Sequence, residues 1–246
     1  MKGLWQLVWL EIKIFAREPL GLFGAVGVPV LLFLALGRAM RGGAGPASPE
    51  WAFLKAGLPV LAALVIATSA VVSLVTIIAI YREGGILKRL RATPLRPATI
   101  LTAHVIVKLL FTAMTLALLL AAGRRYAAVT PEQVAPFLVA VLFSTAGVLS
   151  IGFLIASLVP TARFAQPVAG LIFYPMIALS GLFFPLAAMP PWLRAVARVM
   201  PLTYAVSLMQ GVWRGDPLMS HLWDVGAIAV FGVLFTALAA RVFRWE

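Results

Sequence analysis

Long uncharged stretches are the feature that most constrains the fold of this chain. Four of them, each about 20 residues or longer, contain no Asp, Glu, Lys or Arg: 19–37, 56–81, 133–162 and 164–193. Helices of this length cross the hydrocarbon core of a bilayer, whereas the strands of a membrane barrel are shorter and alternate in polarity. Only 11% of the residues are charged, compared with about 25% in soluble domains. The sequence therefore predicts an all-α integral membrane protein.

The apolar pattern predicts six transmembrane helices in a single domain, residues 1–246. The expected spans are 19–37, 56–81, about 99–122, 134–158, one within 164–193, and about 222–241. The loop between the second and third spans is rich in basic residues: Arg82, Lys88, Arg89, Arg91 and Arg96. Short basic loops stay in the cytoplasm, and an even number of spans puts both termini on one side. We therefore expect a multi-pass protein of the cytoplasmic (inner) membrane with both termini in the cytoplasm.

Residues 2–18 are expected to form an amphipathic interfacial helix. On a helical wheel its basic and amide side chains share one face: Lys2, Gln6, Lys13 and Arg17. Such a helix lies in the plane of the membrane surface. The alternative is that it extends the first span. Glu11 and Glu18 form a second, narrower polar line, as expected where the helix also contacts protein.

Residues 82–97 are expected to contain a short cytoplasmic helix. Its apolar side chains share one face: Ile86, Leu87 and Leu90. Its basic side chains point elsewhere: Lys88, Arg89 and Arg91. Pro94 and Pro97 end the helix. A charged helix with an apolar edge at the mouth of two spans is expected to serve as a docking element.

Residues 180–204 do not fit a straight span, because four prolines interrupt 17 residues: Pro185, Pro190, Pro191 and Pro201. We expect a re-entrant or interfacial segment on the outer side, with a short helix between Pro191 and Pro201. Its candidate gate residues are Phe183, Phe184, Pro185 and Pro190. The alternative is a static plug that packs the outer ends of the helices.

Several kinds of chemistry are disfavoured by the sequence. It has no cysteine and no G-x-x-x-x-G-K-[ST] motif, so it has neither thiol chemistry nor a P-loop. His104 and His221 are predicted at opposite membrane faces, which disfavours a metal site. No carboxylate falls at the centre of a predicted span, as proton-coupled carriers require. We read the net charge of +12 as basic flanks that face anionic lipid and not as a nucleic-acid surface.

Lys108 is the one charge predicted well inside a span. An ionisable residue within the membrane is a functional hypothesis by default. Lys108 lies about one helical turn below the expected inner interface, so its side chain could instead snorkel to that surface. Substrate contact, a structural ion pair and snorkelling are the three alternatives.

Two motifs together resemble those of ABC-2 type transporter permeases, the membrane subunits of one class of ABC exporters. The first is Arg82-Glu83-Gly84, followed by Leu90-Arg91-Ala92-Thr93-Pro94-Leu95. The second runs from Ser180-Gly181 through Met189-Pro190-Pro191-Trp192-Leu193 to Pro201-Leu202-Thr203-Tyr204. Length and layout also match, so the resemblance covers nearly the whole chain. Gly85 stands where the family often has threonine.

The resemblance implies a transport subunit that is not itself an enzyme. Two copies of a separate ABC ATPase would bind ATP and Mg²⁺, and a second permease copy, identical or a close paralogue, would complete the pathway. The helix after the second span would be the coupling helix that receives ATPase motion. Its candidate contact residues are Arg82, Glu83, Ile86, Leu87, Leu90 and Arg91.

The expected substrate is amphipathic or lipid-like, exported from the cytoplasm or the inner leaflet. Phe173, Tyr174 and Lys108 are the candidate path residues. The alternative for the aromatic pair is packing or lipid contact. The competing hypothesis for the whole chain is a membrane enzyme or carrier that acts without an ATPase.

Overall fold

The computed structural model describes residues 2–17, 19–39, 49–86, 97–123, 131–183 and 185–242. Within these ranges the chain is helical and has no β-strand, which confirms the all-α prediction. The elements are α1 (Lys2–Arg17), α2 (Pro19–Leu22), η1 (Phe23–Gly27), α3 (Val28–Ala39), α4 (Pro49–Ala67), η3 (Thr68–Ser73), α5 (Leu74–Glu83), α7 (Pro97–Gly123), α8 (Pro131–Leu158), α9 (Ala162–Leu179), η4 (Leu186–Ala188), α10 (Pro191–Ala197), α11 (Pro201–Arg214), η5 (Leu218–His221) and α12 (Leu222–Val242).

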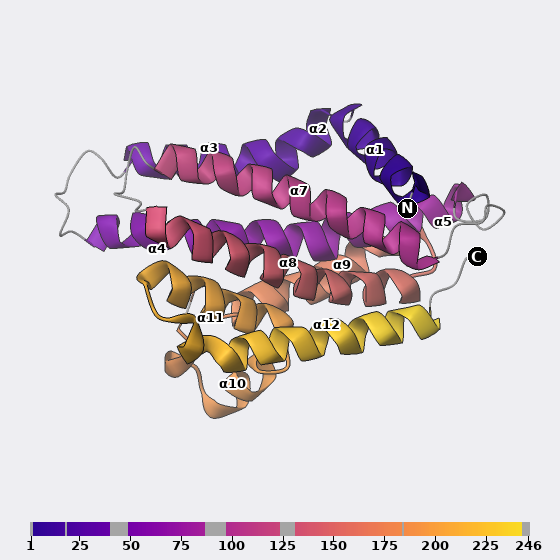
Figure 1. Cartoon of the computed structure of the whole chain (residues 1–246). Coiled ribbons are helices and arrows are strands. Elements are labelled where there is room, and N and C mark those ends of the chain that lie inside the picture. The colour runs from indigo at the N-terminus through magenta and orange to yellow at the C-terminus, as the bar shows by residue number, and fades with distance from the viewer. Residues whose placement is uncertain are drawn as a thin grey trace.

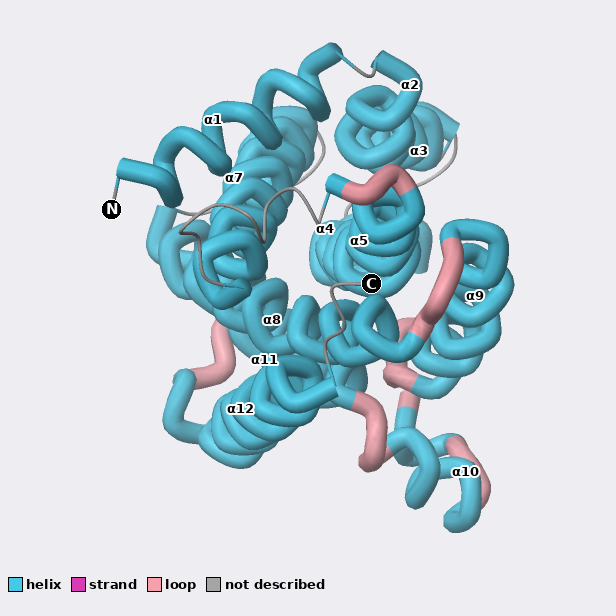
Figure 2. The backbone as a smooth tube through the Cα atoms, turned by 90° about the vertical axis from the view of Figure 1, so that its right-hand side faces the viewer, coloured by secondary structure: helices cyan, strands magenta, loops and turns pink. Residues whose placement is uncertain are grey.

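The long helices run side by side in an elongated bundle, and α1 lies obliquely across one end of it (Figure 1). We call this the α1 end. The last turns of α5 and α12 lie there too, whereas the turn that precedes α12 lies at the opposite end. Viewed along the bundle, α8 is central and is surrounded by α4, α5, α7, α11 and α12 (Figure 2).

Two glycines allow α8 to occupy this crowded position. A Cβ at Gly152 would lie 1.9 Å from the carbonyl oxygen of Ala70 in η3. One at Gly147 would lie 2.2 Å from Cγ2 of Ile228 in α12. Small residues let membrane helices approach this closely, since packing and not hydrophobic burial holds them together in lipid. The core of the bundle therefore depends on α8 having no side chain at these two positions.

Among the described residues, five helical stretches are long and apolar enough to cross a membrane: Gly57–Glu83, Thr102–Ala122, Glu132–Leu158, Ala162–Leu179 and Leu218–Val242. They coincide with the second to sixth predicted spans. The predicted first span, 19–37, is helical through α2, η1 and α3, but it is not among the five, so the count of six stays a prediction. The expected 2–18 helix is present as α1, and its place at the membrane surface likewise stays a prediction.

Two segments of π-helix interrupt the first two helical rods, which we define as α2–η1–α3 and α4–η3–α5. The second span continues from α4 through η3 to α5, and η3 is π-helical over Thr68–Ser73. In the first rod, η1 is π-helical over Phe23–Gly27. Such segments widen the helix, weaken the regular hydrogen-bond ladder, and occur frequently at functional sites.

The proline-rich segment 180–204 is broken as expected, because prolines start new helices in it. Pro191 opens α10 and Pro201 opens α11, in the first turn where the missing N–H is not needed. Arg194 in α10 donates hydrogen bonds of 2.9 to 3.1 Å to three carbonyls of the preceding turn, those of Leu186, Ala187 and Met189. A side chain thus fixes this irregular backbone. Re-entry of the segment into the membrane stays a prediction.

Replacing Gly152 by alanine is expected to destabilise the bundle, because the new Cβ would meet the backbone of η3, which cannot move aside as a flexible side chain can. Overpacking of this kind costs about 1–3 kcal/mol. The matched control is Gly226→Ala on α12, where a Cβ meets nothing within 4 Å. Unfolding in mixed detergent micelles should show a loss for Gly152→Ala and none for Gly226→Ala; equal stability of the two variants would contradict the packing.

Candidate functional site

An arginine in the last turn of α5, Arg82, contacts the C-terminal end of α8. Arg82 is buried, and its guanidinium donates hydrogen bonds to the carbonyl oxygens of Ala156, at 3.0 Å, and of Val159. The last carbonyls of a helix have no partner within it and carry the negative end of the helix dipole. A positive side chain with several donors therefore both satisfies and neutralises this helix end.

The next residue, Glu83, caps the N-terminus of α9 with its carboxylate. Its Oε1 accepts a hydrogen bond of 2.9 Å from the backbone N–H of Ala162, the first residue of α9. The N-cap residue Thr161 makes no capping bond with its own side chain, so a carboxylate from another helix takes that place. Arg82 and Glu83 thus hold both sides of the turn at 159–161, and we call this contact the Arg82–Glu83 clamp.

Six residues were predicted to couple the chain to a partner, and the structure describes three of them. Arg82 and Glu83 form the clamp; Arg82 is buried, whereas Glu83 keeps an exposed surface. Ile86 is 38% exposed and follows Gly85, whose φ of +66° ends the helix in a left-handed turn. The other three lie outside the described residues: Leu87, Leu90 and Arg91. The coupling role stays a prediction for all six.

A second group of buried polar side chains joins α1, α5 and α7 near the clamp. The Oε1 atom of Glu11 accepts a hydrogen bond of 2.9 Å from the hydroxyl of Tyr81, and its Oε2 lies 3.8 Å from Nδ1 of His104. Burial raises the pKa of the Glu11 carboxyl, while the Tyr81 hydrogen bond and the charge of Lys108 act against this rise. The sequence hinted at Glu11 through its separate polar line on α1, but gave no sign of its partners.

Lys108, one turn along α7 from His104, is buried within the chain and does not extend to its surface. Its ammonium donates a hydrogen bond of 2.5 Å to Oγ of Ser73 in η3 and lies 5.5 Å from the centre of the Phe15 ring. These contacts disfavour snorkelling. They leave the other two alternatives, a structural ion pair and contact with a substrate.

The predicted aromatic path residues lie far from Lys108. Phe173 and Tyr174 meet edge to face on α9, with ring centres 5.4 Å apart, and Tyr174 is 72% exposed. Helices α7 and α9 lie on different sides of the bundle (Figure 2), so one chain does not bring the three candidates together. Of the outer-gate candidates, Phe183, Pro185 and Pro190 are exposed, and Phe184 lies outside the described residues.

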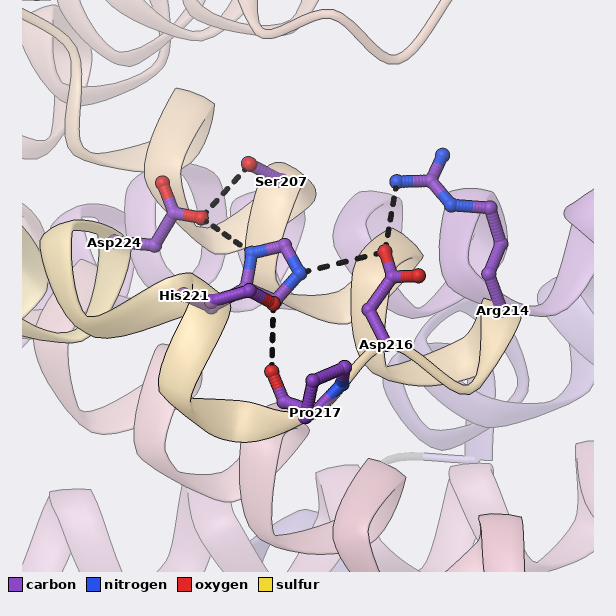
Figure 3. A network of polar contacts seen from close by, with 7 residues as sticks. Ser207, Arg214, Asp216, Pro217, His221 and Asp224 are labelled. Atoms are coloured by element: carbon purple, nitrogen blue, oxygen red, sulfur yellow. Dashed lines mark hydrogen bonds and ion pairs between the residues drawn. The ribbon is translucent and has the colours of Figure 1, made fainter.

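A third polar group ties α11 to α12 (Figure 3), at the end of the bundle opposite α1 (Figure 1). One carboxylate oxygen of Asp224 accepts a hydrogen bond of 2.8 Å from Ser207 and lies 2.8 Å from Nδ1 of His221. Asp216 lies 3.5 Å from both Nε2 of His221 and Arg214. Ser207 donates to the carboxylate and not to the imidazole, so the histidine does not activate it as a nucleophile. Within the part of the chain that the structure describes, no group of three or more acidic or His side chains is placed to hold a metal ion.

Comparison with known proteins assigns the chain to a family. The model of the ABC-2 type transporter family matches residues 2–213, which confirms the resemblance inferred from the two motifs. A daunorubicin resistance ABC transporter permease protein of Streptomyces coeruleorubidus is 27% identical over 96% of this chain and 84% of its own length. Nodulation protein J of Rhizobium leguminosarum bv. trifolii is 26% identical over 39% of this chain and 36% of its own length.

The packing of α1 is expected to weaken as the pH rises. Because burial raises the pKa of Glu11, the folded chain favours the protonated carboxyl. That stabilisation is complete below the usual glutamate pKa of about 4.3 and is lost as the pH rises through the raised value. Glu11→Gln keeps a neutral side chain of the same shape and removes this dependence.

The measurement compares apparent unfolding temperatures of wild type and Glu11→Gln at successive pH values upward from the usual glutamate pKa of about 4.3. The variant should gain stability relative to wild type as the pH rises. Glu132→Gln, at an exposed position, is the control and should show a constant difference. A constant difference for Glu11→Gln as well would refute the assignment.

Proposed function

The chain belongs to the ABC-2 type transporter family, and from that premise we propose that it is the permease subunit of an ATP-driven exporter. As a member of this family it is a multi-pass subunit of a membrane transporter. In the proposed complex, two ABC ATPase subunits bind ATP and Mg²⁺. Two permease copies, identical or closely related, form the pathway. The complex lies in the inner membrane with six spans per permease and both termini in the cytoplasm.

The observation that carries the coupling part of the proposal is the Arg82–Glu83 clamp. It lies at the start of the segment, residues 82–97, that is expected to receive ATPase motion. It contacts the end of α8 and the start of α9 through charge-assisted hydrogen bonds, which are stronger than neutral ones. A displacement of the segment after α5 would therefore move the α8–α9 turn as well. Because α8 is central, that movement would reach the whole bundle.

The proposed substrate class is amphipathic or lipid-like. The name of the Streptomyces coeruleorubidus relative refers to daunorubicin resistance, which supports a small amphipathic cargo. The exposed aromatic pair on α9, Phe173 and Tyr174, supports an apolar surface along the path once a second permease copy is present. Phe183, Phe184, Pro185 and Pro190 are proposed as the outer gate.

Charge reversal at Glu83 is expected to uncouple ATP hydrolysis from export. A lysine there would place positive charge against the positive start of α9, and the clamp would lose its contact with Ala162. The variant should still fold, because Glu83 is exposed and Arg82 remains in place, and the measurement is made on complexes that retain the ATPase after purification. ATP hydrolysis by the purified complex should persist, while resistance of host cells to a panel of amphipathic compounds, daunorubicin among them, should fall by about 10-fold or more.

The matched control is Glu132→Lys, which reverses an exposed carboxylate in the first turn of α8, at the end opposite α1. It should leave both hydrolysis and resistance close to wild type. Undiminished resistance in Glu83→Lys would remove the coupling role. Failure of the wild-type chain to co-purify with any ABC ATPase would remove the proposed function itself.

A further inference from the structure

A cavity of about 290 Å³ lies between the first two helical rods and α7. Both π-helical segments contribute to its wall, η1 through Gly24 and η3 through residues from Thr68 to Ser73. Small-molecule pockets begin at about 300 Å³, so the space suits one small ligand or one arm of a larger one. The clamp, the aromatic pair and the outer-gate residues do not line it.

The cavity is long, and its chemistry changes along its length. From Ser73 to Leu61 its wall follows the second span over roughly 18 Å, at 1.5 Å of rise per residue. Lys108 and Ser73 lie at the end nearer α1. Aliphatic side chains from two helices, α3 and α4, lie farther along: Val28, Leu32, Leu61, Leu64 and Val65. A cavity with one charged end and one apolar end matches an amphiphilic ligand.

The charge at the polar end is positive. Lys108 has a hydroxyl and an aromatic ring as its near contacts, and neither carries a formal negative charge. The Glu11 carboxylate attracts Lys108 electrostatically, but its close contacts are with Tyr81 and His104. An ammonium in an apolar wall is costly unless an anion pairs with it. A ligand with a negative head would meet that requirement, whereas a cationic ligand would be repelled.

A second observation points independently to a ligand. Thr112 lies one turn beyond Lys108 on the cavity wall and is 3% exposed, and its hydroxyl has no hydrogen-bond partner among the described residues. Buried hydroxyls are almost always bonded, because leaving one unpaired costs about 1–3 kcal/mol. A ligand oxygen held next to Lys108 would give this hydroxyl a partner.

We propose that this cavity is a binding site for an anionic amphiphile, with a carboxylate or phosphate head at Lys108, Ser73 and Thr112 and an alkyl chain along α3 and α4. A free fatty acid-like molecule and an anionic phospholipid with one chain inserted share the chemistry that the site recognises, a negatively charged head with oxygen acceptors. The site needs neither ATP nor a partner subunit, so it goes beyond the transporter role.

The test uses three probes of equal chain length that differ only in the head: dodecanoate, dodecanol and dodecylamine. Binding to the purified full chain in a neutral detergent is followed by native mass spectrometry. The dissociation constant of dodecanoate should be lower than those of the other two probes by about 10-fold or more, as expected for a charge-assisted contact out of water. Equal binding of the three probes would overturn the proposal.

Two variants locate the binding. Lys108→Met keeps the length of the side chain without its charge and should abolish the preference for dodecanoate, whereas Lys108→Arg should retain it. Gly24→Leu should block all three probes, because a Cβ at Gly24 meets nothing within 4 Å and the added side chain fills the cavity without a backbone clash. Gly226→Leu, at an equally open position on α12, is its control. Unchanged dodecanoate binding in both Lys108→Met and Gly24→Leu would overturn the proposal. Native mass spectrometry counts ligand only on folded protein, so poor folding of one variant would not hide this result.

Competition identifies the source of the ligand. Displacement of dodecanoate by phosphatidylglycerol, but not by phosphatidylcholine, assigns the site to an anionic lipid. Resistance to both lipids assigns it to a free amphiphile, and either result supports the anionic site. Because the titration involves no ATPase, its failure would leave the transporter role intact, and failure of the complex to assemble would leave this site intact.

Discussion

The contact on which the structure and its proposed function depend is that of Arg82 and Glu83 with the α8–α9 turn. Two neighbouring residues of opposite charge meet two helix ends of opposite polarity. The guanidinium lies at the carbonyls that end α8, and the carboxylate lies at the first N–H of α9. Each pairing neutralises partial charges that the helices cannot satisfy themselves. The second span, the central helix and its successor are thereby joined at one point at the α1 end.

The central position of α8 means that a movement of the α8–α9 turn would affect most of the bundle. Helix α8 touches most of the other long helices, and at Gly152 and Gly147 it leaves no room for a side chain. Tightly packed elements of this kind shift as units and do not deform gradually. The cavity beside η1 and η3 is, by contrast, a place where the bundle is incompletely filled. It lies next to the interface between α1 and α7, so ligand binding there and the packing of α1 share Phe15 and Lys108.

Local patterns in the sequence predicted the elements well, and long-range contacts poorly. The second to sixth spans follow from long apolar runs, and the helix starts at Pro191 and Pro201 follow from the missing N–H of proline, because both are properties of neighbouring residues in the sequence. The clamp joins residues more than 70 positions apart, and nothing in the run Tyr81-Arg82-Glu83 specifies which helix ends it meets. Lys108 was recognised as unusual, but its partner Ser73 and the empty space beside it are products of tertiary packing.

The most direct test of the clamp as a transmission element is a distance measurement in the complex with the ATPase. The chain contains no cysteine, so spin labels at Phe164→Cys on α9 and Leu238→Cys on α12, both exposed, report on these helices alone. Trapping ATP in the complex should shift the distance between the labels in the otherwise unmodified chain. The same shift should be absent when Arg82→Gln removes the charge from the clamp. An identical shift in both proteins would contradict the account.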